Sequence, residues 1–130
     1  MPYRDLREYL HVLEEKGLLC HVTAEVDKDW EISAVCRHTF RTIPEQRRPA
    51  LMFDRIKGSA MPFVVGILGG SRRIYGTALE TDLEGVWEKW ERSKNPVPPR
   101  LVKSGPCQDV VRMGEEANIE RLPAAVWTVG

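Results

Sequence analysis

The segment whose residue types most directly suggest chemistry is a glycine turn with two arginines, Gly69-Gly-Ser-Arg-Arg73. It follows an apolar stretch and precedes residues with helical spacing. Backbone N–H groups at the helix start and two guanidinium groups could therefore bind an anion. The segment lacks the Lys-Ser/Thr pair of a P-loop and the spacing of a dinucleotide fingerprint. The alternative is an ordinary turn in which Ser71 caps a helix and both arginines are solvated.

The histidines and cysteines show none of the spacings of metal or redox sites. Zinc ligands recur at short, defined separations, whereas the three histidines here are scattered. The cysteines are odd in number, far apart and without a Cys-x-x-Cys motif, so we expect buried, reduced thiols in a cytoplasmic protein. These residues are His11, His21, His38, Cys20, Cys36 and Cys107.

Carboxylates and tryptophans give the remaining candidates. Glu115 and Glu116 follow a glycine and are expected in a solvated loop, because adjacent side chains do not share a strand face and cannot form an acid–base pair there. Trp87 and Trp90 lie at i, i+3, so they share a helix face and are expected to pack in a core or an interface. Trp127 is expected to line a following domain's site or to cover an interface.

Helical and strand patterns alternate over residues 1–94, which predicts an α/β (α+β) domain with a mixed sheet flanked by helices. The apolar run 63–68 is expected to be a central strand because it is apolar on both faces. A helix capped by Thr81 or Asp82 is expected to turn its large apolar residues inward. Those residues are Leu83, Val86, Trp87 and Trp90. The other predicted elements are helices over 3–16, over 29–42 and after Ser71, and strands over 18–22 and 50–53.

A proline-rich connector at 95–99 predicts a domain boundary, because Asn95-Pro-Val-Pro-Pro99 cannot continue a helix. Residues 100–130 are predicted to hold one or two strands and a turn near Gly114. One or two strands alone cannot bury a sheet face, so the chain is expected to be the N-terminal part of a larger protein.

Composition excludes several classes of function. The 130 residues contain 19 basic and 19 acidic side chains, which argues against non-specific electrostatic binding of nucleic acid. No apolar run approaches the roughly 20 residues that span a bilayer. The N-terminus lacks the apolar core of a signal peptide, which also favours a cytoplasmic protein.

Six segments, taken in order, resemble the pattern of the UbiD-type decarboxylases, named for the enzyme that decarboxylates 3-polyprenyl-4-hydroxybenzoate. Asp5-Leu-Arg through Gly17-Leu-Leu is similar to DLR-x-x-(I/L)-x-x-L-x-x-x-G-x-L. Glu25-Val-Asp through Ile32 is similar to x-V-D-x-x-x-E-I. Pro49-Ala-Leu-Met-Phe through Pro62 is similar to P-A-L-L-F-E-x-x-K-G…M-P.

The second half continues the likeness. Leu68-Gly-Gly-Ser-Arg-Arg73 resembles L-F-G-(S/T)-x-x-R. Gly105-Pro-Cys-Gln108 and the stretch from Ile119 to Trp127 resemble A-P-C-Q…D-L-x-x-(L/I)-P…W. The resemblance implies a small N-terminal α/β domain over 1–94, followed at 100–130 by the lead-in to a flavin-binding split β-barrel.

The resemblance also implies an activity and its cofactors. Family members reversibly decarboxylate aromatic, heteroaromatic or α,β-unsaturated acids, using prenylated FMN held with a divalent metal, usually Mn²⁺, and K⁺. The modified flavin accepts the electrons that CO₂ leaves behind, while the protein orients and electrostatically supports it. The family's metal ligands, flavin contacts and Glu-Arg-Glu set lie downstream of the matched segments. No catalytic, cofactor-binding or metal-binding residue is therefore carried over to this chain, which is expected to be inactive alone.

Three hypotheses follow. The first is the N-terminal part of such a decarboxylase. Its partners would be the remainder of the enzyme and a small carboxylic acid substrate. The remainder would also assemble the enzyme into a homo-oligomer. The second is a non-enzymatic accessory subunit that packs on a larger decarboxylase through exposed tryptophans. The third is an anion-binding module built on Gly69–Arg73.

Overall fold

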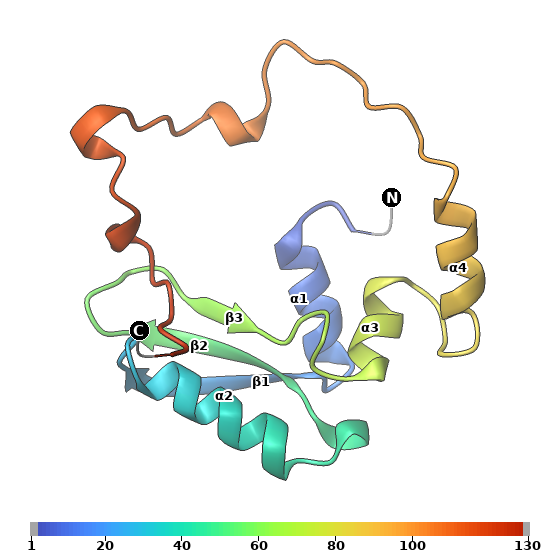
Figure 1. Cartoon of the computed structure of the whole chain (residues 1–130), viewed down its shortest axis with the longest axis horizontal. Coiled ribbons are helices and arrows are strands. Elements are labelled where there is room, and N and C mark those ends of the chain that lie inside the picture. Colours follow the sequence, from blue (N-terminus) through green and yellow to red (C-terminus); the bar gives the residue numbers. More distant parts are fainter. Residues whose placement is uncertain (1–2, 129–130) are drawn as a thin grey trace.

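The computed structural model describes residues 3–128, which form a three-stranded mixed sheet with helices on both faces (Figure 1). The α+β prediction is confirmed. Strand β1 (Leu19–Val26) pairs in parallel with β2 (Ala50–Ile56), which pairs antiparallel with β3 (Phe63–Val65). The register of β1 shifts between Val22 and Glu25. The α-helices are α1 (Leu6–Glu15), α2 (Glu31–Thr42), α3 (Arg72–Ala78) and α4 (Val86–Ser93).

Helix α2 covers one face of the sheet. Its stripe places Ile32 and Cys36 against Phe53 of β2, and all three side chains are fully buried. Helical spacing at 3.6 residues per turn puts these two α2 residues on one side of the helix. Val35 and Phe40 pack at the edge of the cluster. The predicted helix over 29–42 is thus confirmed to within two residues.

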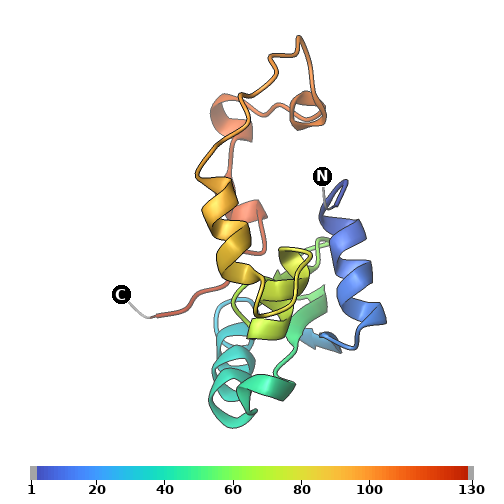
Figure 2. The ribbon, with the colours of Figure 1, turned by 90° about the vertical axis from the view of Figure 1, so that its right-hand side faces the viewer.

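Helices α1 and α3 cover the opposite face, so that the sheet lies between α1 and α2 (Figure 2). Leu13 and Ile74 are fully buried there. The Tyr9 hydroxyl donates to the Ile67 carbonyl at 2.5 Å and lies 3.2 Å from the Ile74 carbonyl. Burial raises the pKa of Tyr9 to about 12. Tyr9 therefore links α1 to the β3–α3 segment through backbone carbonyls.

The prediction of a central strand over 63–68 is wrong. Strand β3 ends at Val65, is only half-buried and lies at an edge, while β2 is central. Gly66 takes a left-handed φ of 79°, which ends the strand, and the Gly70 N–H donates to the Gly66 carbonyl at 2.8 Å. The apolar residues after Val65 thus enter a tight turn instead of extending the ladder.

The inward orientation predicted for the helix after Thr81 is also wrong. Helix α4 begins only at Val86 and buries none of its residues. Trp87 is 73% exposed and Trp90 is 51% exposed, like Leu83 just before the helix. The Asp82 carboxylate accepts from the Gly85 N–H at 2.7 Å, so it caps the turn that leads into the helix. The Trp90 indole N–H donates to the Tyr75 hydroxyl on α3 at 2.7 Å, but the apolar side of α4 stays largely exposed.

Residues 95–122 form a long extended segment, here called the extended arm, which loops away from the sheet in Figure 1. The strands predicted for 100–130 are absent from the described part of that range, up to residue 128. The arm contains only 3₁₀ turns at Pro106–Gln108, Gly114–Glu116 and Ile119–Arg121. The chain then returns to the domain, where Pro123 is buried and the Val126 N–H donates to the Lys28 carbonyl at 3.1 Å.

A histidine between two carboxylates connects α1 to the sheet. His21 Nδ1 lies 2.8 Å from Asp54 Oδ1 on β2, and its Nε2 lies 3.3 Å from Glu14 Oε1 on α1. The hydrogen bond that the imidazole donates to Asp54, followed by the negative charges of Asp54 and Glu14, raises the pKa of His21 above its ordinary value of 6.5. The imidazolium form is thus favoured in the folded chain.

The turn at Gly70 gives a stability prediction with an adjacent control. A Cβ at Gly70 would lie 2.6 Å from the Gly66 carbonyl oxygen, whereas a Cβ at Gly69 would meet nothing within 4 Å. We expect Gly70→Ala to lower the free energy of unfolding by about 1–3 kcal/mol. Gly69→Ala should change it by less than about 0.5 kcal/mol. Urea unfolding followed by circular dichroism measures both, and equal effects would contradict the tight turn.

The His21 contacts give a pH prediction. Because the folded-state pKa is raised, the stabilisation from His21 is complete below pH 6.5 and is lost as pH rises through the folded-state pKa. NMR titration of the imidazole protons should place the His21 pKa above 6.5 and should show it falling in Asp54→Asn. An unchanged His21 titration in that variant would show that the contact with Asp54 does not form in solution.

Candidate functional site

The glycine turn is held by contacts within the chain. Ser71 Oγ accepts from the Ile74 N–H at 3.3 Å, so the predicted helix cap is confirmed. The next free N–H of the helix start, that of Arg72, donates to the Glu45 carboxylate. The position that an anion would take at this helix start is therefore filled by a negatively charged side chain of the same chain.

The arginines around this turn do not converge on a common ligand. Arg48 donates through Nη2 to the Ile43 carbonyl at 3.1 Å, and its guanidinium lies 5.8 Å from the centre of the Phe40 ring. Arg73 reaches the Gln46 carbonyl at 3.5 Å. A hollow of about 290 Å³ over the turn is lined by both Glu45 and Arg72. An incoming anion would thus meet a carboxylate, and helix α3 is only seven residues long. The turn carries no anion site in this arrangement.

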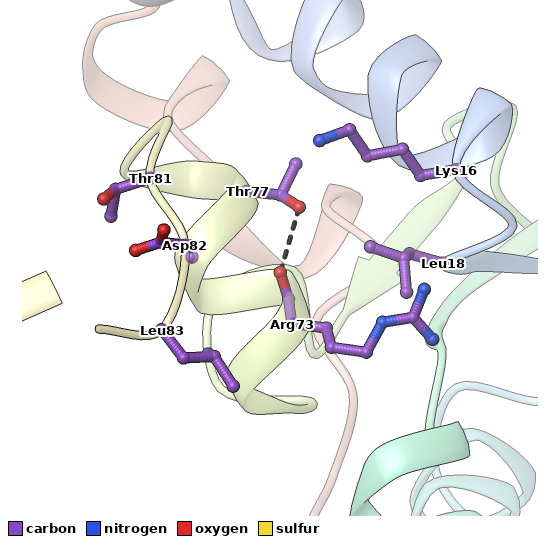
Figure 3. A pocket seen from close by; sticks show the side chains of 8 residues that line it. Lys16, Leu18, Arg73, Thr77, Thr81, Asp82 and Leu83 are labelled. Carbon is purple, nitrogen blue, oxygen red and sulfur yellow. Dashed lines mark hydrogen bonds between the residues drawn. The ribbon is translucent and has the colours of Figure 1, made fainter. Parts of the chain in front are cut away.

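A groove of about 470 Å³ lies on the other side of α3, between that helix and the end of α1 (Figure 3). Lys16 and Arg73 line it, and within residues 3–128 neither has a carboxylate oxygen within 4.0 Å. The Thr77 hydroxyl donates to the Arg73 carbonyl at 2.9 Å, so it is committed to the helix backbone. Asp82 also lines the groove, which therefore presents charges of both signs, and it offers neither an activated nucleophile nor a positioned base.

The histidines lie apart from one another. His21 contacts Asp54 as described, and His11 lies 3.4 Å from Glu15 on the outer side of α1. His38 is exposed on α2, where its carbonyl accepts from the Thr42 hydroxyl at 2.8 Å. Across residues 3–128, no three His, Cys, Asp or Glu side chains form a group that could hold a metal ion.

The prediction of buried thiols holds for one cysteine and is wrong for two. Cys36 is buried in the α2 cluster, and burial raises the pKa of its thiol to about 11. Cys20 and Cys107 are exposed, because β1 lies at the sheet edge and the extended arm packs against no other described element at Cys107. The Glu115–Glu116 pair is solvent-exposed, as predicted for a loop.

Trp127 lies beside α2, where the returning chain meets the domain. It lines a groove of about 500 Å³ together with Trp30, Arg37 and Val126. Trp30 and Trp127 stay 60% and 45% exposed, so the groove presents two aromatic side chains next to a cation. Sequence reasoning noted both tryptophans but did not predict that Trp30 and Arg37 lie beside Trp127, since no local pattern reveals that residue 126 bonds to residue 28.

A family model and a protein of known sequence match this chain. The sequence model of the 3-octaprenyl-4-hydroxybenzoate carboxy-lyase N-terminal domain matches residues 10–94. An uncharacterized protein of Synechocystis is 29% identical, over 92% of this chain and 28% of its own length. No helix within residues 3–128 combines the length and the apolar character needed to cross a bilayer.

Solved structures extend the likeness. The UbiD-class enzyme HmfF from Pelotomaculum thermopropionicum, in complex with FMN, is 36% identical with a TM-score of 0.75, over 96% of this chain and 27% of that one. Its evolved dimeric form, in complex with prFMN, is 35% identical with a TM-score of 0.77, over 98% and 29%. The apo 3,4-dihydroxybenzoic acid decarboxylase from Enterobacter cloacae is 27% identical with a TM-score of 0.79, over 98% and 28%.

The chain thus spans less than a third of the length of these relatives. The match to the family model covers well over half of this chain, and the structural likeness covers nearly all of it. The chain belongs to the family of UbiD-class carboxy-lyase N-terminal domains.

Proposed function

We propose that this chain is the N-terminal part, or a separate N-terminal subunit, of a prenylated-FMN-dependent decarboxylase. The enzyme would act reversibly on an aromatic, heteroaromatic or α,β-unsaturated carboxylic acid. The single observation that carries the proposal is the likeness, over almost the entire chain, to UbiD-class enzymes solved with FMN and prFMN. Mn²⁺ and K⁺ would accompany the flavin, and the enzyme would work in the cytoplasm as a homo-oligomer assembled through its remaining part.

The boundary between the two domains would lie at the proline-rich segment. Residues 1–94 form the accessory α/β domain, 95–99 the connector, and 100–130 the lead-in to a flavin-binding split barrel. Substrate, metals and flavin would be bound by the remainder of the enzyme, whether it follows on the same polypeptide or on a second one.

We expect FMN to be bound outside the described residues. Its phosphate would favour a helix N-terminus, but the start of α3 is occupied by the Glu45 carboxylate. The groove beside α3 places the Asp82 carboxylate alongside Lys16 and Arg73, which would oppose the binding of a phosphate there. The chain's contribution would therefore be structural: a rigid unit that supports the catalytic body.

One observation favours the second candidate, an accessory subunit without catalytic residues. Leu83, Trp87 and Trp90 are each more than half exposed and lie on or next to α4. Tryptophans of this kind are common anchors at protein interfaces. In this case the decarboxylase partner would be encoded separately.

Flavin content distinguishes the isolated chain from the complete enzyme. We expect the purified 130-residue chain to show no flavin absorbance and to release no CO₂ from aromatic or α,β-unsaturated acids, because the start of α3, which could favour the phosphate, is already occupied by the Glu45 carboxylate. The protein purified from its source should carry flavin within a larger chain or a complex. Circular dichroism and a cooperative unfolding transition serve as the control that the isolated chain is folded.

Two outcomes would contradict the proposal in different ways. Stoichiometric flavin on the isolated chain would show that the cofactor site lies within residues 1–130. A native mass spectrum of the source protein that shows only the bare chain, without ligand or partner, would contradict a decarboxylase role altogether.

A further inference from the structure

The extended arm displays an unusual amount of apolar surface. Eight of its large aliphatic side chains are between 49% and 96% exposed, and Leu101 is the most exposed of them. They occur along the whole arm and not in a single patch. These residues are Val97, Leu101, Val102, Val110, Val111, Met113, Ile119 and Leu122.

The composition of the arm differs from that of a solvated linker. Disordered and linker segments are poor in aliphatic residues because they need no burial. Loops longer than about 12–15 residues without regular structure are uncommon in compact domains and are usually functional or disordered. Here the arm carries many exposed aliphatic side chains; it follows α4 and ends at buried Pro123.

The charge of the arm does not indicate a charged partner. Its basic and acidic side chains are equal in number, so it has no net charge with which to attract a nucleic acid or an anionic surface. The basic residues are Arg100, Lys103, Arg112 and Arg121, and the acidic residues are Asp109, Glu115, Glu116 and Glu120. Its contact with a partner should therefore be hydrophobic and insensitive to salt.

The comparison structures indicate the occupant. HmfF aligns with 96–98% of this chain, a share too large to omit the arm, so residues of the arm have counterparts in an enzyme whose remaining part is present. This chain accounts for only 27–29% of those chains. We propose that the extended arm is the contact surface for the flavin-binding body of the decarboxylase, which packs against the arm's aliphatic side chains. This inference rests on the proposed function.

Native cysteines provide the test. Cys107 lies in the arm and is exposed, Cys20 is exposed on β1, and Cys36 is buried. In the isolated folded chain, a maleimide should label Cys20 and Cys107 but not Cys36. In the protein purified from its source, labelling of Cys107 should be slower by about tenfold or more, while Cys20 keeps its rate.

A cysteine at the most exposed apolar position tests the surface more directly. In the Cys107→Ser background, Leu101→Cys should react freely in the isolated chain and should be protected in the complete protein to the same degree as Cys107. The substitution leaves the fold intact, because Leu101 is 96% exposed.

Charged substitutions then test whether apolar contacts provide the protection. Leu101→Asp with Val111→Asp should return Cys107 in the complete protein toward the labelling rate of the isolated chain. The matched pair Lys103→Asp with Ser104→Asp, at exposed polar positions of the same arm, should not. Neither pair should move the unfolding midpoint of the isolated chain.

The possible failures are distinguishable. Equal Cys107 rates in the isolated chain and in the source protein would overturn the inference, whatever the flavin content. Protection in an assembly of this chain alone would assign the arm to a second copy and would also overturn it. Protection by a larger body that carries no flavin would overturn the proposed function, and with it the flavin-binding occupant.

Discussion

The parallel pairing of β1 with β2 is the constraint on which the rest of the domain depends. Two neighbouring parallel strands cannot be joined by a tight turn, so the chain must cross one face of the sheet between them. Helix α2 makes that crossing, and its Ile32 and Cys36 then bury Phe53. The opposite face is left to α1 and α3, which meet there through Leu13, Ile74 and the Tyr9 hydroxyl.

Local signals in the sequence were sufficient where a structure depends on local interactions. The span of α2 and the Ser71 cap both follow from residues within one or two helical turns. The errors concern what each segment packs against. A central strand at 63–68, an inward face on α4 and strands after residue 100 all require a partner surface, and a one-dimensional pattern cannot show whether that surface is present.

The candidate site illustrates the same limit. The glycine turn has the local chemistry of an anion-binding loop, yet Glu45, 27 residues earlier, supplies the negative charge that the helix start favours. The pairing of His21 with Asp54 depends on the register of β1 on β2, which no spacing in the sequence reveals. The family, in contrast, could be recognised from short ordered motifs, because these reflect common ancestry and do not require knowledge of contacts.

The two edges of the sheet limit how this domain can associate. The register shift between Val22 and Glu25 disturbs the free edge of β1, and β3 offers only three residues at the other edge. Irregular and short edges are poor templates for adding a strand from another chain. A neighbour must therefore be recognised by side chains and not by backbone ladders. The domain is in this way protected against the edge-to-edge polymerisation that threatens small open sheets.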